Sequence, residues 1–302
     1  MPRAAFAVRK AIIRLFLPRR LTRIAIDSDR PAILLHALSA ARKTGVTVIR
    51  PFIIFAQERT GSSTLLLLLN CHPAVKCLFE PFSPGNTSPY AAHCDTLRNT
   101  HGLEAAILWL FRGCNAFKHV WKRSGWPFEN APDDNRRILL CGATIIFLSR
   151  KNALRRAISS QISEQMGVWV RSSNIDSERI RAHQFQPLDI PRLRNEIAGS
   201  QKLLAEYRAA LSAGSIPWRE WTYEDFFASA MSLDARMHAV QNVLAFLGLP
   251  PVSEPDRLAK MHGFLDPTAT GFQNEQAYNK IPNIQEVEKE LGNDQTGFIF
   301  KT

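Results

Sequence analysis

Residues 57–65 contain the side chains best suited to bind an anion in this chain of 302 residues. An apolar run leads into Gln-Glu-Arg-Thr-Gly-Ser-Ser-Thr and then into a run of leucines, which predicts a strand, a tight loop and a helix. Such a loop directs backbone N–H groups and a helix N-terminus at one point. Arg59 adds a guanidinium group, and Gly61 lies at the turn. Hydroxyl donors are supplied by Thr60, Ser62, Ser63 and Thr64. We therefore expect the loop to hold a phosphate-like group.

The loop differs from the one that binds nucleoside triphosphates. In that motif a lysine follows the last glycine and reaches the β- and γ-phosphates, whereas Ser62 follows Gly61 here. Hydrolysis of ATP or GTP is therefore not expected. On the loop alone, an ordinary strand-to-helix turn with Thr60 or Ser62 as the helix N-cap is an equal alternative.

A second candidate anion site follows the apolar residues 143–148, which predict a buried strand. Arg150 comes at the end of this strand, and Ser159 follows nine residues later on the next predicted helix. An arginine and a serine in these positions can hold one phosphate from two sides. For this segment alone, a surface arginine and an exposed helical serine are the alternative.

Taken together, these segments resemble the sulfotransferases that use 3′-phosphoadenosine 5′-phosphosulfate (PAPS). The resemblance rests on the loop, on Arg150 with Ser159, and on the run Ala-Ile-Ser-Ser followed by Glu-Gln-Met-Gly-Val-Trp. It is most similar to the bacterial branch that sulfates trehalose-type sugars, Nod factors or lipopolysaccharide. The resemblance covers residues 52–169, with weaker similarity in residues 221–226 and 281–288.

The resemblance implies that PAPS is the co-substrate and that no metal ion takes part. It gives Arg59 the bridging position at the sulfuryl group, and it makes Arg150 and Ser159 a clamp for the 3′-phosphate. The 5′-phosphosulfate would be bound by Thr60, Gly61, Ser62, Ser63 and Thr64. Glu58 departs from the family pattern because it brings a negative charge next to an anion site, so we expect it to point away or to pair with an arginine.

Sulfuryl transfer also needs a group that accepts the proton of the acceptor hydroxyl. Glu80, in Leu-Phe-Glu-Pro-Phe, follows the second predicted strand, and the resemblance to sugar sulfotransferases with such a segment supports it as the base. Lys118 resembles the lysine of a Gly-Phe-Lys segment in several family members, which implies binding of sulfate or acceptor. A surface salt bridge for Glu80 and a solvated side chain for Lys118 are the alternatives. We rank His119 below Glu80 as a base.

Strands alternate with helices along the rest of the chain. Strands are predicted at residues 48–55, 75–79, 115–120, 143–148 and 216–223, and helices after the loop and at residues 101–111, 152–169, 191–211, 233–247 and 284–291. Residues 254–280 are predicted to form a polar loop. This order predicts an α/β protein with a three-layer, P-loop-like fold, in which helices flank a central, mostly parallel sheet. Ligands of such sheets bind beyond the carboxyl ends of the strands.

Residues 1–48 are expected to form a basic N-terminal arm and helix, and residues 49–302 the sulfotransferase domain. Residues 1–26 contain seven Lys and Arg residues and no acidic residue, with apolar residues between them. This pattern predicts an amphipathic helix on an anionic membrane surface. A helix packed on the main domain and, less strongly, a mitochondrial presequence are alternatives. No apolar run approaches the roughly 20 residues that span a bilayer.

The whole-chain composition favours an anionic partner, because the net charge is +11. The five cysteines include no C-x-x-C pair, which argues against a disulfide framework or a zinc site and favours a cytoplasmic protein. Peripheral association with the membrane through residues 1–26 is the further option for its location. The leading hypothesis is sulfuryl transfer from PAPS to a hydroxyl of a carbohydrate or glycolipid. The alternatives are a P-loop-like kinase of a small molecule and a non-enzymatic, basic membrane-surface binder. No nucleic-acid-binding motif appears.

Overall fold

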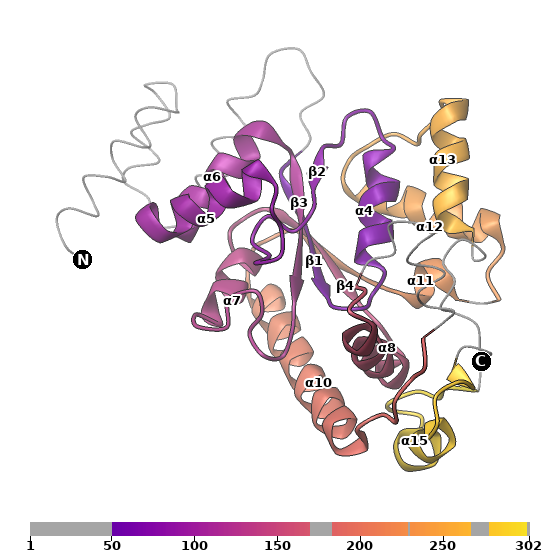
Figure 1. The fold of residues 1–302 in the computed structure, drawn as a ribbon. Coiled ribbons are helices and arrows are strands. Elements are labelled where there is room, and N and C mark those ends of the chain that lie inside the picture. The colour runs from indigo at the N-terminus through magenta and orange to yellow at the C-terminus, as the bar shows by residue number, and fades with distance from the viewer. Residues whose placement is uncertain (1–49, 170–182, 229, 267–277, 301–302) are drawn as a thin grey trace, which may run out of the picture.

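The structure is a computed structural model that describes residues 50–169, 183–228, 230–266 and 278–300 (Figure 1). The arm and helix predicted for residues 1–48 lie outside these residues. The division into two parts therefore stays a prediction.

Five parallel strands form one central sheet. They are β1 (Phe52–Gln57), β2 (Cys77–Leu78), β3 (Ala116–Trp121), β4 (Thr144–Ser149) and β5 (Trp218–Thr222). Their order is β2-β3-β1-β4-β5, and every neighbouring pair is parallel. The predicted α/β class and parallel sheet are confirmed. Because β1 is central, the loop that follows it lies between the carboxyl ends of β3 and β4.

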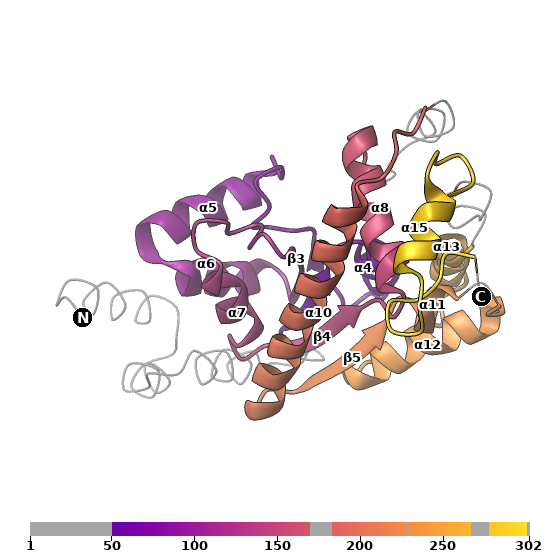
Figure 2. The same ribbon diagram turned by 90° about the horizontal axis from the view of Figure 1, so that it is seen from below.

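Helices cover both faces of this sheet (Figures 1 and 2). One face packs against α4 (Ser62–Asn70), α11 (Glu224–Phe227), α12 (Leu233–Phe246) and α13 (Pro255–Leu265). The other packs against α5 (Pro89–His101), α6 (Leu103–Gly113), α7 (Asp133–Leu139) and α10 (Ile190–Ala213). Strand β1 serves both cores, since Ile54 and Ala56 join the first and Ile53 and Phe55 the second. This alternation follows from the two-residue period of a strand.

A third apolar cluster lies beside the sheet. Helix α8 (Ala153–Met166) packs there against the first half of α10 and against α15 (Ile284–Leu291). Asn152 caps α8, because its side chain accepts a hydrogen bond from the backbone N–H of Arg155 at 2.8 Å. Helix α8 is thereby fixed above the end of β4, where it carries Ser159 toward the loop that follows β1.

Four helices of the described residues were not predicted, and one of them, α11, has only four residues. Helix α13 lies in residues that the sequence predicted to be loop, and that prediction is wrong. The segment is polar because the helix buries only Met261 and Leu265, so it shows no clear apolar period. The helix begins with Pro255, a residue that suits the first helical turn. Helix α5 buries only Ala91 and Cys94, too few residues for a clear apolar period. Helix α7 is short and gives the same weak signal.

Candidate active site

The loop between β1 and α4 turns through two residues with left-handed backbone. Arg59 has φ 62° and Gly61 has φ 77°. Helix α4 begins after Gly61 with no side-chain cap, while the Thr60 hydroxyl donates to the carbonyl of Gln57 at 2.6 Å. The proposed N-cap role of Thr60 or Ser62 is therefore wrong. The N–H groups in the first turn of α4 have no side-chain acceptor among the described residues, which suits an anion at this end.

Arg59 connects the loop to α8. Its Nε donates to the Ser159 hydroxyl at 2.9 Å, across 100 residues of sequence. Its Nη1 donates to the carbonyl of Trp169 at 2.6 Å. Arg150 Nη1 lies 3.4 Å from the carbonyl oxygen of Arg59, as donor to it. The structure therefore brings together the two candidate anion sites that the sequence placed far apart.

The two arginines lie close enough to influence each other. Burial, and next the positive charge of Arg150, lower the pKa of Arg59 from its ordinary value. The Arg150 guanidinium lies 4.2 Å from the centre of the Tyr223 ring, and its Nε is 4.0 Å from Glu224 Oε1. Glu224 also accepts the backbone N–H groups of Lys151 and Asn152, at 2.9 and 3.1 Å. The Glu224 carboxylate therefore interacts both with Arg150 and with the backbone at the start of α8. An anion bound between Arg59 and Arg150 would reduce the repulsion between their positive charges.

Glu80 and Lys118 form a second group beside the start of α4. Lys118 Nζ lies 2.7 Å from Glu80 Oε1 and donates to the Ser63 hydroxyl at 2.7 Å. The lysine side chain is 1% exposed and the glutamate side chain 13%. Burial lowers the pKa of Lys118, while the carboxylate of Glu80 acts in the opposite direction. The alternatives of a solvated lysine and of a glutamate paired with a surface arginine are therefore wrong.

Glu58 is buried and pairs with basic side chains other than Arg59 and Arg150. Its Oε2 lies 3.1 Å from Lys122 Nζ, and its Oε1 lies 3.7 Å from Arg156 Nη1. The Ser160 hydroxyl donates to Oε1 at 3.0 Å. The expectation that Glu58 pairs with a nearby arginine is confirmed. Lys122 and Arg156 thus neutralise the negative charge of Glu58.

His119 lies in the core. Its Nε2 is 2.7 Å from Asn135 Oδ1, and its ring lies 5.4 to 6.4 Å from the rings of Phe55, Phe82 and Phe128. Burial lowers its pKa to about 4. A neutral, fully enclosed imidazole packs the core.

Two aromatic or basic residues at the site had no predicted role. Tyr223 directly follows β5, next to the end of β4, and supports Arg150. Lys122 directly follows β3 and places its Nζ 3.8 Å from the centre of the Trp169 ring. Both occupy positions just after strand ends, which is the signal that identifies such residues in a parallel sheet.

Three further observations concern the cysteines, the groups that could hold a metal ion and the apolar length of the helices. All five cysteines are buried and free. No group of three or more His, Cys, Asp and Glu side chains is arranged to hold a metal ion in the part of the chain that the structure describes. No helix within that part is long and apolar enough to cross a bilayer.

No family model matches the chain, and no curated protein matches it. Among solved structures, the chain is similar to a sulfotransferase from Alicyclobacillus acidocaldarius, with 21% sequence identity and a TM-score of 0.38. The match covers 75% of this chain and 95% of that one.

Proposed function

We propose that the protein transfers a sulfuryl group from PAPS to a hydroxyl group of a carbohydrate or glycolipid. The observation that supports this most is the meeting of Arg59 with Ser159 and Arg150. Two anion-binding segments lie side by side, one at the start of α4 and one at α8. This pairing suits a donor that carries phosphate groups in two separate places.

The donor's charged groups have separate partners in this proposal. The first turn of α4, with Ser62, Ser63 and Thr64, binds the 5′-phosphosulfate. Arg150 and Ser159 bind the 3′-phosphate, and Arg59 lies between the two groups. In the free chain Arg59 is hydrogen-bonded to Ser159. Donor phosphate replaces that bond and gives both side chains a charged partner.

Glu80 is the proposed general base. It accepts the proton of the acceptor hydroxyl while the acceptor oxygen bonds to sulfur and the bond between sulfur and the 5′-phosphate oxygen breaks. Lys118 lies 2.7 Å from both Glu80 and Ser63, so its ammonium can stabilise negative charge on the sulfuryl oxygens. The proton of the acceptor goes to Glu80, and the 3′-phosphoadenosine 5′-phosphate part of PAPS is the leaving group.

Two exposed aromatic rings support a sugar as acceptor. Phe79 is 36% exposed and adjoins Glu80, and Trp169 is 40% exposed and adjoins Arg59 through its carbonyl. Such rings offer apolar faces on which the C–H face of a sugar can pack. The centre of the Phe79 ring lies 3.9 Å from Lys118 Nζ and that of the Trp169 ring 3.8 Å from Lys122 Nζ, so each ring adjoins a basic residue of the site.

The test compares donor binding with transfer in a Glu80→Gln variant. Calorimetry at low salt should show that PAPS affinity changes by less than about threefold, because Glu80 does not contact the donor phosphates. Transfer of label from radiolabelled PAPS to a panel of sugars and glycolipids should fall by about a hundredfold or more.

Glu104→Gln is the matched control, because Glu104 is a half-exposed carboxylate that pairs with Arg137 away from the site. It should leave both binding and transfer unchanged. Absence of PAPS binding by the unmodified protein, or turnover of ATP with magnesium in its place, would overturn the proposal. Undiminished transfer by Glu80→Gln would assign the base to another group.

A further inference from the structure

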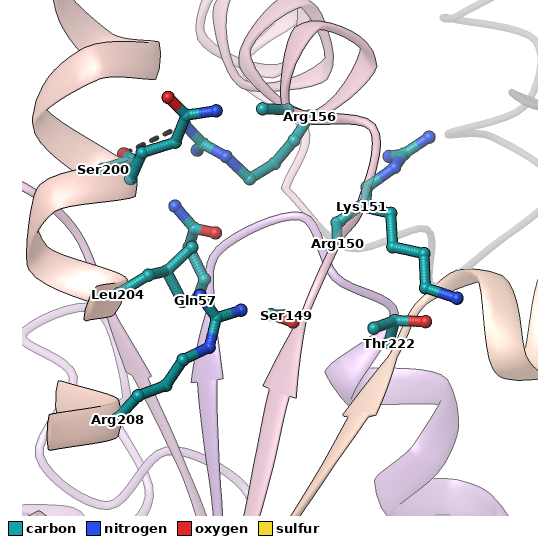
Figure 3. Close-up of a pocket in the computed structure, with 11 residues that line it drawn as sticks. Gln57, Ser149, Arg150, Lys151, Arg156, Ser200, Leu204, Arg208 and Thr222 are labelled. Atoms are coloured by element: carbon teal, nitrogen blue, oxygen red, sulfur yellow. Dashed lines mark hydrogen bonds between the residues drawn. The ribbon is translucent and has the colours of Figure 1, made fainter. Parts of the chain in front are cut away.

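A separate polar cavity of about 180 Å³ lies behind the loop, between the ends of β1, β4 and β5 and helices α8 and α10 (Figure 3). The residues used in the argument below are Gln57, Arg156, Ser200, Arg208 and Thr222. Among the described residues that line the cavity, none is a carboxylate and four are arginine or lysine. The lining therefore favours a ligand with negative charge.

Gln57 is the first sign that the cavity holds a ligand. It is 1% exposed, and neither its amide oxygen nor its amide nitrogen has a hydrogen-bond partner among the described residues. Its amide group lies between the side chains of Arg156 and Arg208 (Figure 3). A buried amide without partners is costly, so native structures rarely contain one without a water molecule or ligand beside it.

Arg156 and Arg208 supply positive charge on the two sides of this amide. Arg156 is buried, and its Nη2 donates to Glu196 and to the Ser200 hydroxyl, at 3.0 Å each. Its Nη1 makes no hydrogen bond within the described part of the chain, and the Glu58 carboxylate lies 3.7 Å from it. Arg208 is held by Glu220 through its Nε and Nη2. Both guanidinium groups are fixed in place by carboxylates outside the cavity lining.

The cavity is distinct from the candidate donor site. Arg150 and Lys151 also line it, but their side chains extend away from Gln57 (Figure 3). Arg59 and the start of α4 do not line it. The centre formed by Gln57, Arg156 and Arg208 thus lies on the α10 side of the sheet, whereas the loop faces α4 and α11.

We propose that this cavity binds one small oxyanion of the sulfate or phosphate class, held by the Gln57 amide, Arg156 Nη1 and the Arg208 guanidinium. One water molecule needs roughly 10–15 Å³ of such a volume, so the cavity has room for a small ion and several waters. The buried Thr222 hydroxyl also has no partner among the described residues, but it lies on the Lys151 side of the cavity, away from Gln57 (Figure 3). The inference is independent of the function proposed above.

The test is a calorimetric titration of the full chain with inorganic sulfate and, separately, with inorganic phosphate. Sodium chloride keeps the ionic strength constant, and saturating 3′-phosphoadenosine 5′-phosphate fills the donor site. We expect one anion to bind per chain. Arg208→Ala should weaken binding about tenfold or more, because it removes a charged donor. Arg194→Ala is the matched control, since Arg194 lies on the same helix and pairs with Glu290.

A second variant guards against a folding defect. Gln57→Leu removes the amide but keeps a side chain of similar size, so it should lose anion binding and keep its melting temperature. Arg59→Ala protein without nucleotide separates the two proposals, because this site should still bind the anion if the donor site fails. Binding that is lost in Arg59→Ala but kept in Arg208→Ala would place the anion at the loop. No binding in any form would mean that the cavity holds only water. Either result would overturn the inference.

Discussion

Lys118 and Arg59 concentrate positive charge around the start of α4. Burial lowers the pKa of both, and the positive charge of Arg59 acts in the same direction on Lys118. Glu80 pairs with Lys118, and Glu58 pairs with Lys122. The electrostatic free energy of these buried positive charges would therefore be lowest with an anion bound beside them.

His119 gives a prediction for the pH dependence of stability. Its folded pKa is about 4, below the ordinary 6.5, because burial disfavours the charged imidazolium. The unfolded chain therefore takes up the proton first as the pH falls. The stabilising contribution is complete above pH 6.5 and is lost as the pH approaches 4. Between pH 7.5 and 5.5 this residue should lower the free energy of unfolding by about 1 kcal/mol.

Urea unfolding at the two pH values measures the effect. The His119→Gln variant keeps a hydrogen-bonding group near Asn135 and should show a smaller decrease over the same interval. Other groups, including His72, whose pKa is also lowered by burial, will still titrate in the variant. An identical decrease in both proteins would show that His119 does not become charged on unfolding in this range.

Among the elements, the loop and α4 depend most on one glycine. Gly61 has φ 77°, and a Cβ atom there would lie 2.7 Å from Cε2 of Phe227 in α11. Gly61→Ala should therefore lower the free energy of unfolding by about 1–3 kcal/mol, through backbone strain and steric overlap. It should also weaken PAPS binding, because the loop and the start of α4 must move.

Gly263→Ala in α13 is the matched control. Nothing lies within 4 Å of its added Cβ, and alanine is the better helix former. This variant should be unchanged or more stable by up to about 1 kcal/mol. Denaturant unfolding and calorimetry with PAPS check both variants. Equal behaviour of the two would show that the loop tolerates a side chain at Gly61.

Strands with continuous apolar runs were predictable from the sequence, whereas weakly amphipathic helices were not. The apolar runs that form most of β1 and β4 identified these strands within a few residues, since buried parallel strands are rich in apolar residues. Strand β3 was also predicted, although Lys118 and His119 interrupt its apolar residues. Helix α13 was missed because two buried residues give almost no period. Strand β1 begins at Phe52, although residues 50 and 51 were also predicted to be strand.

The arrangement of the site was only partly predictable. Parallel strands place Arg59 and Arg150 at the same edge of the sheet, but only the strand order puts β1 directly beside β4. The ion pair of Glu80 with Lys118 and the polar cavity around Gln57 depend on side-chain packing between segments distant in sequence. Such contacts between distant segments cannot be predicted from the order of residues within one segment.

At the scale of the whole molecule, positive charge is unevenly distributed. Residues 1–26 hold seven of the 38 Lys and Arg residues and none of the 27 Asp and Glu residues. Removing seven positive charges from a net charge of +11 leaves +4. This segment thus carries most of the excess charge, and its interleaved apolar residues favour contact with an anionic membrane surface.

Deletion of residues 1–26 tests this role. Vesicles with about 30% anionic lipid should bind the full chain and lose that binding after the deletion, since each Lys or Arg near such a surface contributes about 1 kcal/mol. Cosedimentation at several salt concentrations measures the effect, and binding should fade as salt rises. PAPS binding should be unchanged, because the donor residues all lie beyond residue 50.

A matched variant separates charge from apolar contact in the same assay. Changing the seven basic residues to glutamine keeps the apolar residues and the length of the segment. Its binding should approach that of the deletion if electrostatic attraction dominates. If the deleted protein still binds vesicles, the attraction comes from elsewhere in the chain and the membrane role of residues 1–26 is refuted. If the deletion also abolishes PAPS binding, the segment packs on the main domain instead, which is the alternative that its sequence left open.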